Sequence, residues 1–177
     1  MLIGRNINLR VVEQSDLELY HHWINSREVA GKYNPWRQIS KDMLVNLYKD
    51  MPEGSQIYII EKKDQTRIGA VANFTVKTSA YELLEIGFFL DPLERRKGYC
   101  TEAVMILVDY IFLSKDIPRI QAISDLQNIG AHKVLEKAGF IREGVIHCMM
   151  FNQGEWRDAA LYSILRRDWE GPKILSK

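Results

Sequence analysis

Residues 95–97 are three consecutive cations near the middle of the chain, and Gly98 follows them. An apolar run that ends at Leu90 comes before the cations, and apolar residues spaced i, i+3 and i+4 come after them. This order predicts a strand, a basic loop and the start of a helix. A helix N-terminus offers unpaired backbone N–H groups and the positive end of the helix dipole. The loop is therefore predicted to bind a phosphate or pyrophosphate.

Other phosphate-binding motifs do not match this loop. The sequence has no G-x-x-x-x-G-K-[ST] motif, and the loop has one glycine where G-x-G-x-x-G has three. P-loop and dinucleotide-fold sites are thus excluded. The alternative is an ordinary solvated surface, in which Gly98 only starts a helix.

The strand before the loop carries the second group that can do chemistry. Residues 81–90 alternate, so that Leu83, Glu85, Gly87 and Phe89 share one face. Glu85 is therefore a carboxylate among apolar neighbours. Such a carboxylate can act as a general base, or it can pair with a basic side chain for structural reasons.

The elements that position these groups follow from apolar periodicity and turn residues. Predicted strands cover residues 6–12, 56–62, 68–77, 81–90, 120–124, 140–151 and 155–165. Predicted helices begin with a capping box of Ser15 and Glu18, at Ser40, at the basic loop and at Asn128, the last one ending at Gly139. Between the first two helices, residues 26–38 are predicted to form a long aromatic loop.

Composition sets wide limits. The 177 residues, 46% of them hydrophobic and 27% charged, predict one domain over residues 1–177. A formal net charge of +1 gives no indication of a nucleic-acid partner. The two cysteines and four histidines lack the spacing of a disulfide framework or a metal site. Without a signal-peptide pattern or a membrane-length apolar run, we expect a cytoplasmic protein with no membrane contact.

Several motifs resemble the GNAT superfamily of N-acetyltransferases. Arg95, Gly98 and Cys100 match the R-x-x-G-x-(small) pattern of its acetyl-CoA pyrophosphate loop. N-I-G-A-H-K-V-L-E-K-A-G-F, followed by I-R-E-G, is similar to the helix that lies beside the pantetheine arm. Over residues 5–168 the resemblance implies the GNAT fold. This α/β fold has a mixed central sheet of about seven strands, of which the fourth and fifth splay apart, and about four flanking helices.

Three further motifs resemble the RimJ/RimL-like branch of ribosomal-protein N-terminal acetyltransferases. They are W-I-N-S-R-E-V, E-I-G-F-F-L-D-P and G-E-W-R-D-A-A-L-Y-S-I-L-R-R-D-W. The resemblance implies transfer of an acetyl group from acetyl-CoA to a primary amine, on a protein N-terminus or a peptide-like acceptor. Spermidine N-acetyltransferases share much of this layout. A polyamine, small-molecule or drug acetyltransferase and a non-catalytic acyl-CoA-binding module are the alternatives.

The resemblance also implies roles for particular residues. Glu85 matches the general base, and Asn128 matches an asparagine that contacts pantetheine, although it also suits a helix N-cap. The position of a common tyrosine acid is Leu135, so the group that protonates the leaving thiolate is unassigned. The cofactor-binding residues implied are Phe88, Phe89, Leu90, Arg95, Arg96, Lys97, Gly98, Tyr99, Cys100, Thr101 and Asn128.

Aromatic residues in two regions are candidates for acceptor binding. Tyr33 and Trp36 lie in the predicted loop, and Trp156 lies in the predicted final hairpin. They are expected to wall the acceptor groove, or the first two to close the edge of the core. The expected partners are acetyl-CoA and an amine acceptor. The sequence allows a homodimer but does not fix the oligomeric state.

Overall fold

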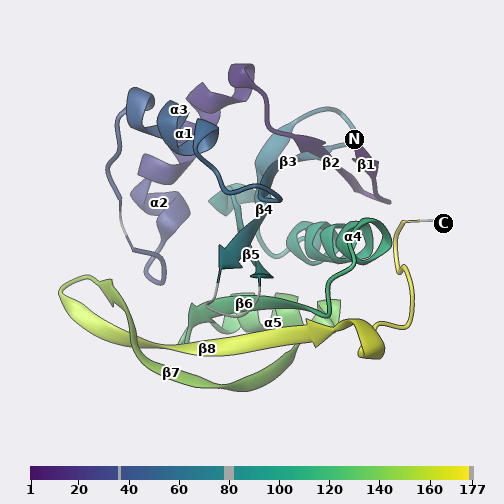
Figure 1. Cartoon of the computed structure of the whole chain (residues 1–177). Helices are drawn as coiled ribbons and strands as arrows, with labels where there is room; N and C mark the ends of the chain where they lie inside the picture. The colour runs from purple at the N-terminus through teal and green to yellow at the C-terminus, as the bar shows by residue number, and fades with distance from the viewer. Residues whose placement is uncertain (36, 78–81, 176–177) are drawn as a thin grey trace.

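The computed structural model describes residues 1–35, 37–77 and 82–175. This part of the chain forms one eight-stranded sheet in the order β1-β2-β3-β4-β5-β6-β8-β7 (Figure 1). The strands are β1 (Leu2–Ile3), β2 (Ile7–Val11), β3 (Gln56–Lys62), β4 (Arg67–Lys77), β5 (Glu82–Leu90), β6 (Arg119–Asp125), β7 (Ile141–Asn152) and β8 (Glu155–Leu165). The α-helices are α1 (Leu17–Asn25), α2 (Arg27–Ala30), α3 (Lys41–Lys49), α4 (Tyr99–Ser114) and α5 (Ile129–Ala138).

Helices cover both faces of the sheet. In Figure 1, α1, α2 and α3 lie on one side of β3, β4 and β5, and α4 lies on the other. The side chains of β5 alternate between these two faces, as predicted. Leu84 and Ile86 join the core under α4 and α5, whereas Phe89 packs against the core under α1. No helix in the described ranges is long and apolar enough to cross a membrane.

Two buried carboxylates fix the position of α4. Glu102 accepts hydrogen bonds from the backbone and side-chain nitrogens of Asn6, both at 2.8 Å. Asp109, only 1% exposed, accepts backbone N–H groups from residues 173–175 at 2.7–3.1 Å. Because buried acceptors are costly to leave unpaired, these bonds hold the helix against both ends of the described chain. The N-terminus of α4 is thereby fixed relative to the sheet.

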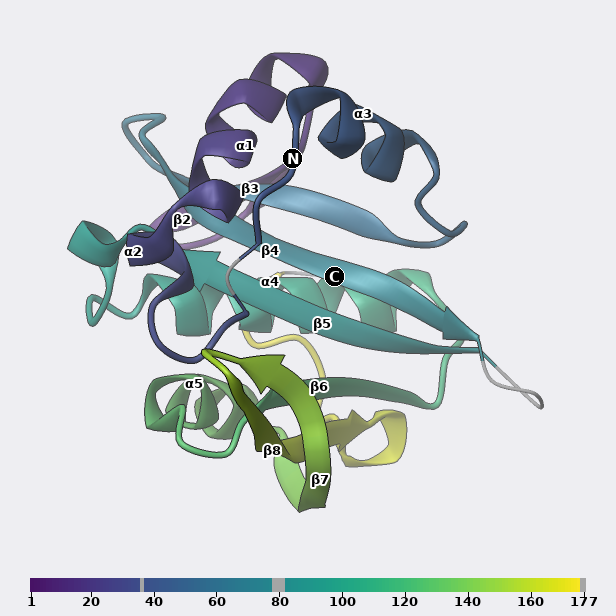
Figure 2. The same cartoon turned by 90° about the vertical axis from the view of Figure 1, so that its left-hand side faces the viewer.

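The strands β5 and β6 are parallel and diverge along their length. Their paired residues are Leu84 with Ile120 and Glu85 with Gln121. In contrast, β6 pairs with β8 from Arg119 to Asp125, and β5 pairs with β4 up to Leu90. Figure 2 shows β6 running away from β5. The predicted splaying of these two strands is confirmed, and Glu85 lies where they separate.

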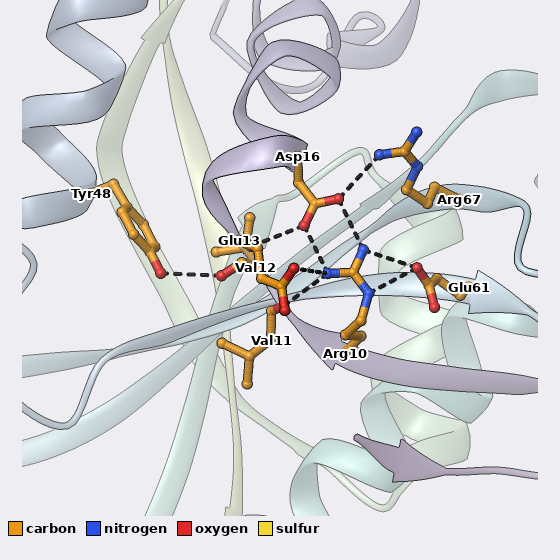
Figure 3. A network of polar contacts seen from close by, with 8 residues as sticks. All are labelled: Arg10, Val11, Val12, Glu13, Asp16, Tyr48, Glu61 and Arg67. Atoms are coloured by element: carbon orange, nitrogen blue, oxygen red, sulfur yellow. Dashed lines mark hydrogen bonds and ion pairs between the residues drawn. The ribbon is translucent and has the colours of Figure 1, made fainter.

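The start of α1 differs from the prediction. The helix begins at Leu17. The carboxylate that accepts a backbone N–H before it is that of Asp16 rather than Glu18, and the N–H is that of Glu13, at 2.9 Å. The predicted capping box of Ser15 and Glu18 is therefore wrong. A capping box is formed instead by Glu13 and Asp16, and Arg10 holds the Asp16 carboxylate through two nitrogens at 2.8 and 2.9 Å (Figure 3).

The same network extends across the sheet. Arg10 also donates to Glu61 at 3.0 Å, and Arg67 donates to Asp16 at 3.1 Å (Figure 3). Burial on its own raises the pKa of Asp16, but the hydrogen bonds from Arg10, Glu13 and Arg67 outweigh it and lower the pKa to about 2. The hydrogen bond to Asp16 in turn raises the pKa of Arg10. Asp16 is therefore ionised in the folded protein at neutral pH.

A short strand and a short α-helix lie outside the predicted set. The two-residue strand β1 adds an eighth strand to the described sheet. The four-residue helix α2 lies within the predicted long loop and is capped by Ser26, whose hydroxyl accepts the Val29 N–H at 3.3 Å. The predicted caps at Ser40 and Asn128 and the predicted helix end at Gly139 are confirmed.

Candidate active site

A cleft of about 910 Å³ lies where β5 and β6 separate. Its walls come from these two strands, from the loops that follow α2 and β5, and from α5 and β7. Figure 2 shows the loop after α2 approaching β7 across the diverging strands. Asn152 bridges them, because its side-chain nitrogen donates to the Lys32 carbonyl at 3.0 Å. The cleft therefore lies between the sheet, the loop that follows α2 and the hairpin of β7 and β8.

The basic loop forms the N-terminus of α4. Gly98 precedes the helix with φ +88°, a left-handed conformation that glycine adopts without strain. The first intrahelical bond runs from the Glu102 N–H to the Gly98 carbonyl, at 3.1 Å. The earlier N–H groups of α4 thus have no acceptor within the helix. A β-carbon built on Gly98 would meet no atom within 4 Å, so this surface is open to a ligand.

The three cations of the loop have different surroundings. Arg95 donates to the Val29 carbonyl at 2.7 Å and to the Leu90 carbonyl at 3.1 Å, which ties α2 to the end of β5. Lys97 pairs with Glu94 at 2.9 Å. Arg96 is exposed and lines the cleft. Arg96 is therefore the loop cation with the freest approach to an anion in the cleft, while Arg95 shapes the loop.

Most of the predicted cofactor residues line one cleft. They are Phe88, Phe89, Leu90, Arg95, Arg96, Gly98, Cys100, Thr101 and Asn128. Lys97 and Tyr99 are not among its lining residues. Since β6 has already diverged, no described strand pairs with one backbone edge of residues 86–90. An extended ligand can pair with that edge as an added strand would.

Cys100 lies in the first turn of α4 and packs against the hydrophobic core. Burial raises the pKa of its thiol to about 12, although the charge of Arg95 acts in the opposite direction. A thiol rather than a thiolate is then present at neutral pH, and the thiol is a poor nucleophile. The structure therefore gives no support to an acyl-cysteine intermediate at this position.

Glu85 is half-buried and lines the cleft. Its carboxylate accepts a hydrogen bond from the Gln121 side-chain nitrogen at 2.8 Å. This partner is a neutral amide, so the contact does not fit the structural ion pair considered from the sequence. A carboxylate at the cleft surface with a neutral donor on one oxygen is suited to accept a proton on the other.

The α5 residues in the cleft have clear structural roles. Asn128 caps α5, and its amide oxygen accepts the Ala131 N–H at 3.1 Å. The cap leaves the amide nitrogen as the atom that can donate to a ligand. Leu135 is 1% exposed and lines the cleft without a polar group. The side chain at this position therefore cannot protonate a leaving thiolate.

Of the aromatic candidates for acceptor binding, Tyr33 and Trp156 do not line the same cleft. Tyr33 lines the cleft. Trp156 is 63% exposed, and its ring packs against Phe151 at 5.5 Å, outside the cleft lining. Trp36 lies outside the described residues. Of this set, Tyr33 is the residue that the described structure places in the site.

Sequence reasoning missed several groups of the site. Lys32, Arg37, Met149 and Met150 line the cleft, and Gln121 contacts Glu85. Met149 lies within an irregularity in β7 and Met150 at its end, because the pairing with β8 shifts between Ile146 and Met150. Alternation along a strand cannot reveal such a shift, because the extra residues change which side chains face the cleft.

Comparisons with known proteins agree with this geometry. A family model described as an acetyltransferase (GNAT) domain matches residues 6–141. Probable N-acetyltransferase YjcK of Bacillus subtilis (strain 168) is 36% identical over 126 residues, which are 70% of this chain and 70% of that protein. The ribosomal protein uS5-alanine N-acetyltransferase of Escherichia coli (strain K12) is 26% identical over 149 residues, 83% of this chain and 75% of that protein. The structure of spermidine N-acetyltransferase from Vibrio cholerae with CoA and spermine has a TM-score of 0.81 at 23% identity, over 92% of this chain and 97% of that one.

Proposed function

The chain belongs to the GNAT acetyltransferase family, and from that premise we propose that it acetylates a protein N-terminus or a peptide-like amine, with Glu85 as the general base. Family membership confirms the prediction of an N-acetyltransferase that uses acetyl-CoA. The acetyl group is supplied as the thioester of acetyl-CoA. The choice of acceptor and the roles of individual residues are the proposal.

The cleft fits an extended, anionic cosubstrate. The free backbone edge of residues 86–90 suits the amide groups of a pantetheine arm. The N-terminus of α4, open at Gly98, offers N–H groups and a positive dipole to a pyrophosphate, and Arg96 adds a charge. Asn128 can donate its amide nitrogen to the same arm. These residues are the proposed cofactor site.

Glu85 supports direct transfer to an amine. An ammonium group must lose a proton before its nitrogen can attack a carbonyl, and a positioned carboxylate can accept that proton, directly or through water. Such general-base catalysis typically contributes 10²- to 10⁴-fold in rate. The leaving thiolate of coenzyme A is stable near neutral pH, because an ordinary thiol has a pKa of about 8.5. Water can therefore supply the last proton where Leu135 cannot.

The observation that carries the choice of acceptor is the scarcity of carboxylates in the cleft. Among its described lining residues, the acidic side chains are Glu85 and Asp125. Asp125 is 3% exposed, accepts the Gln127 N–H at 2.8 Å and lies 3.5 Å from Arg157. Glu85 is thus the acidic group left for the acceptor. A polyamine carries several ammonium groups and needs several anionic partners, whereas a peptide N-terminus presents one.

Lys32 and Arg37 strengthen this argument. Both are exposed and line the cleft on the side of the α2 loop. Like charges at a binding surface disfavour the wrong partner. The two cations oppose a polycation and tolerate the neutral or acidic residues that follow a peptide N-terminus.

An acceptor panel tests the proposal. Thiol release from acetyl-CoA is followed with peptides of varied N-terminal residues, with spermidine and spermine, and with aminoglycosides. We expect kcat/KM for at least one peptide to exceed that for each polyamine by tenfold or more. N-acetylated copies of the active peptides are the matched controls, because they lack the amine. Efficient turnover of polyamines with no turnover of any peptide would show that the acceptor proposal is wrong.

A further inference from the structure

We propose that Gln121 is a positioning residue for the reaction, which holds the Glu85 carboxylate toward the cleft and is itself oriented by Arg119. The inference rests on the proposed role of Glu85 as the base. Gln121 lies directly opposite Glu85 on β6, in the last pair before the strands diverge. Its amide nitrogen lies 2.8 Å from Glu85 Oε2.

The contact belongs to a chain of polar groups. Arg119 donates through Nη2 to the Gln121 amide oxygen at 3.3 Å. The same guanidinium holds Glu143 with two bonds, at 3.0 and 3.1 Å. Ser163 donates its hydroxyl to Glu143 at 2.6 Å. The hydrogen bond from Ser163 is the main influence that lowers the pKa of Glu143, and with Arg119 it outweighs the opposing effect of burial, so the acidic end of the chain is ionised at neutral pH.

The chemistry of arginine fixes which way the Gln121 amide points. A guanidinium has donors and no acceptor, so only the amide oxygen can face Arg119. The NH₂ group must then face the other way, toward Glu85. An amide turned by 180° would place NH₂ against the guanidinium and oxygen against the carboxylate. Both contacts would be repulsive, so Arg119 selects the orientation in which Gln121 donates to Glu85.

A neutral donor suits a general base better than a cation in the same place. A cation within about 4–6 Å of a carboxylate favours its charged form and weakens it as a base. Here the positive charge of Arg119 is separated from Glu85 by the length of the Gln121 amide, and it is balanced by Glu143. On the other side of Glu85, the paired residue on β4 is the apolar Phe74. Gln121 can therefore orient the carboxylate without neutralising it.

The first test is Gln121→Leu, which keeps the size of the side chain and removes the donor. Because a misplacement of about 1 Å can cost 10²-fold, we expect kcat to fall by roughly 10- to 100-fold. The KM for acetyl-CoA should change by less than about twofold, since Gln121 does not line the cleft. Gln56→Leu is the matched control: Gln56 is also a half-buried strand glutamine, but it lies on β3 and outside the cleft lining. The control should keep its kcat.

A double-mutant cycle separates positioning from general damage to the sheet. If Gln121 acts through Glu85, then adding Gln121→Leu to Glu85→Gln should change kcat by less than about twofold. An undiminished loss in that background would overturn the positioning role. Gln121→Asn withdraws the amide by one methylene and provides a second variant if Gln121→Leu does not fold.

The outcomes distinguish the inference from the proposed function. If Glu85→Gln alone leaves kcat unchanged, the base assignment is wrong and the positioning role falls with it. If Glu85→Gln lowers kcat while Gln121→Leu and Gln121→Asn do not, the base stands and only the role of Gln121 is overturned.

Discussion

Replacement of Gly98 by valine tests the cofactor loop most directly. Gly98 has φ +88°, and an L-residue in the left-handed region costs about 1–2 kcal/mol. Space is not the obstacle, because an added β-carbon would meet nothing within 4 Å. The substitution therefore acts by displacing the backbone of the loop and by placing a branched side chain where the pyrophosphate is proposed to bind. We expect the Kd for acetyl-CoA to rise at least tenfold, which corresponds to about 1.4 kcal/mol, because the displaced loop and the branched side chain would weaken the proposed contact with the pyrophosphate.

Gly154 provides a matched control for this variant. It has φ +84° and also has nothing within 4 Å of an added β-carbon, but it lies in the turn between β7 and β8. Gly154→Val should carry the same backbone strain. Both variants should therefore lose roughly 2–8 °C in Tm, since about 1–2 kcal/mol corresponds to that range in a chain of this size.

Titration calorimetry with acetyl-CoA on both folded variants decides the matter. The expected result is a raised Kd for Gly98→Val and an unchanged Kd for Gly154→Val. Unchanged affinity in Gly98→Val would refute the assignment of this loop to the cofactor. Equal losses in the two variants would show that strain elsewhere, rather than contact with the cofactor, lowers the affinity.

Three further predictions concern other groups of the chain. Glu85→Gln should lower kcat by roughly 10²- to 10⁴-fold and abolish the acidic limb of the pH–rate profile, with acetyl-CoA affinity unchanged; a near-normal kcat with the acidic limb intact would remove Glu85 from the mechanism. The pKa of Asp16 is lowered from 3.8 to about 2, so its contribution of about 2 kcal/mol is present above pH 4 and is lost as the pH falls to 2. Urea unfolding from pH 2 to 6 should show this loss in the natural protein and a flatter profile in Asp16→Asn. Iodoacetamide at pH 7.5 should label the exposed Cys148 well before the half-buried Cys100, and peptide mass spectrometry that found equal rates would contradict the raised thiol pKa.

The parts of the fold that local signals control were predictable from the sequence. The predicted strands 56–62 and 155–165 have the bounds of β3 and β8 in the structure. Helix caps at Ser40 and Asn128 and the helix end at Gly139 also follow from neighbouring residues alone. In each case the deciding interaction spans only a few positions of the chain, so a short window contains it.

The features that were missed depend on distant residues or on very short segments. The Asp16 side chain that precedes α1 is held by Arg67, which lies far along the chain. Helix α2 has four residues, too few to show a helical period. The contact between Glu85 and Gln121 requires the register of two parallel strands joined by a long crossover, and alternation within either strand does not contain that register.

The divergence of β5 and β6 connects the cofactor site with the proposed base. The strands stop pairing after Glu85 and Gln121, so the next residues of β5 keep a free backbone edge for an extended ligand. Glu85 lies at the end of the cleft where β5 and β6 still pair. A ligand bound along the free edge of β5 would reach there the face of the sheet that α1 and α2 cover. A shift of the strand register by one residue would turn the side chain of Glu85 to the opposite face, toward the core under α4. The proposed site of chemistry therefore lies at the same two residue pairs that join β5 to β6, and Gln121, a member of the last pair, is placed to orient the proposed base for the same reason.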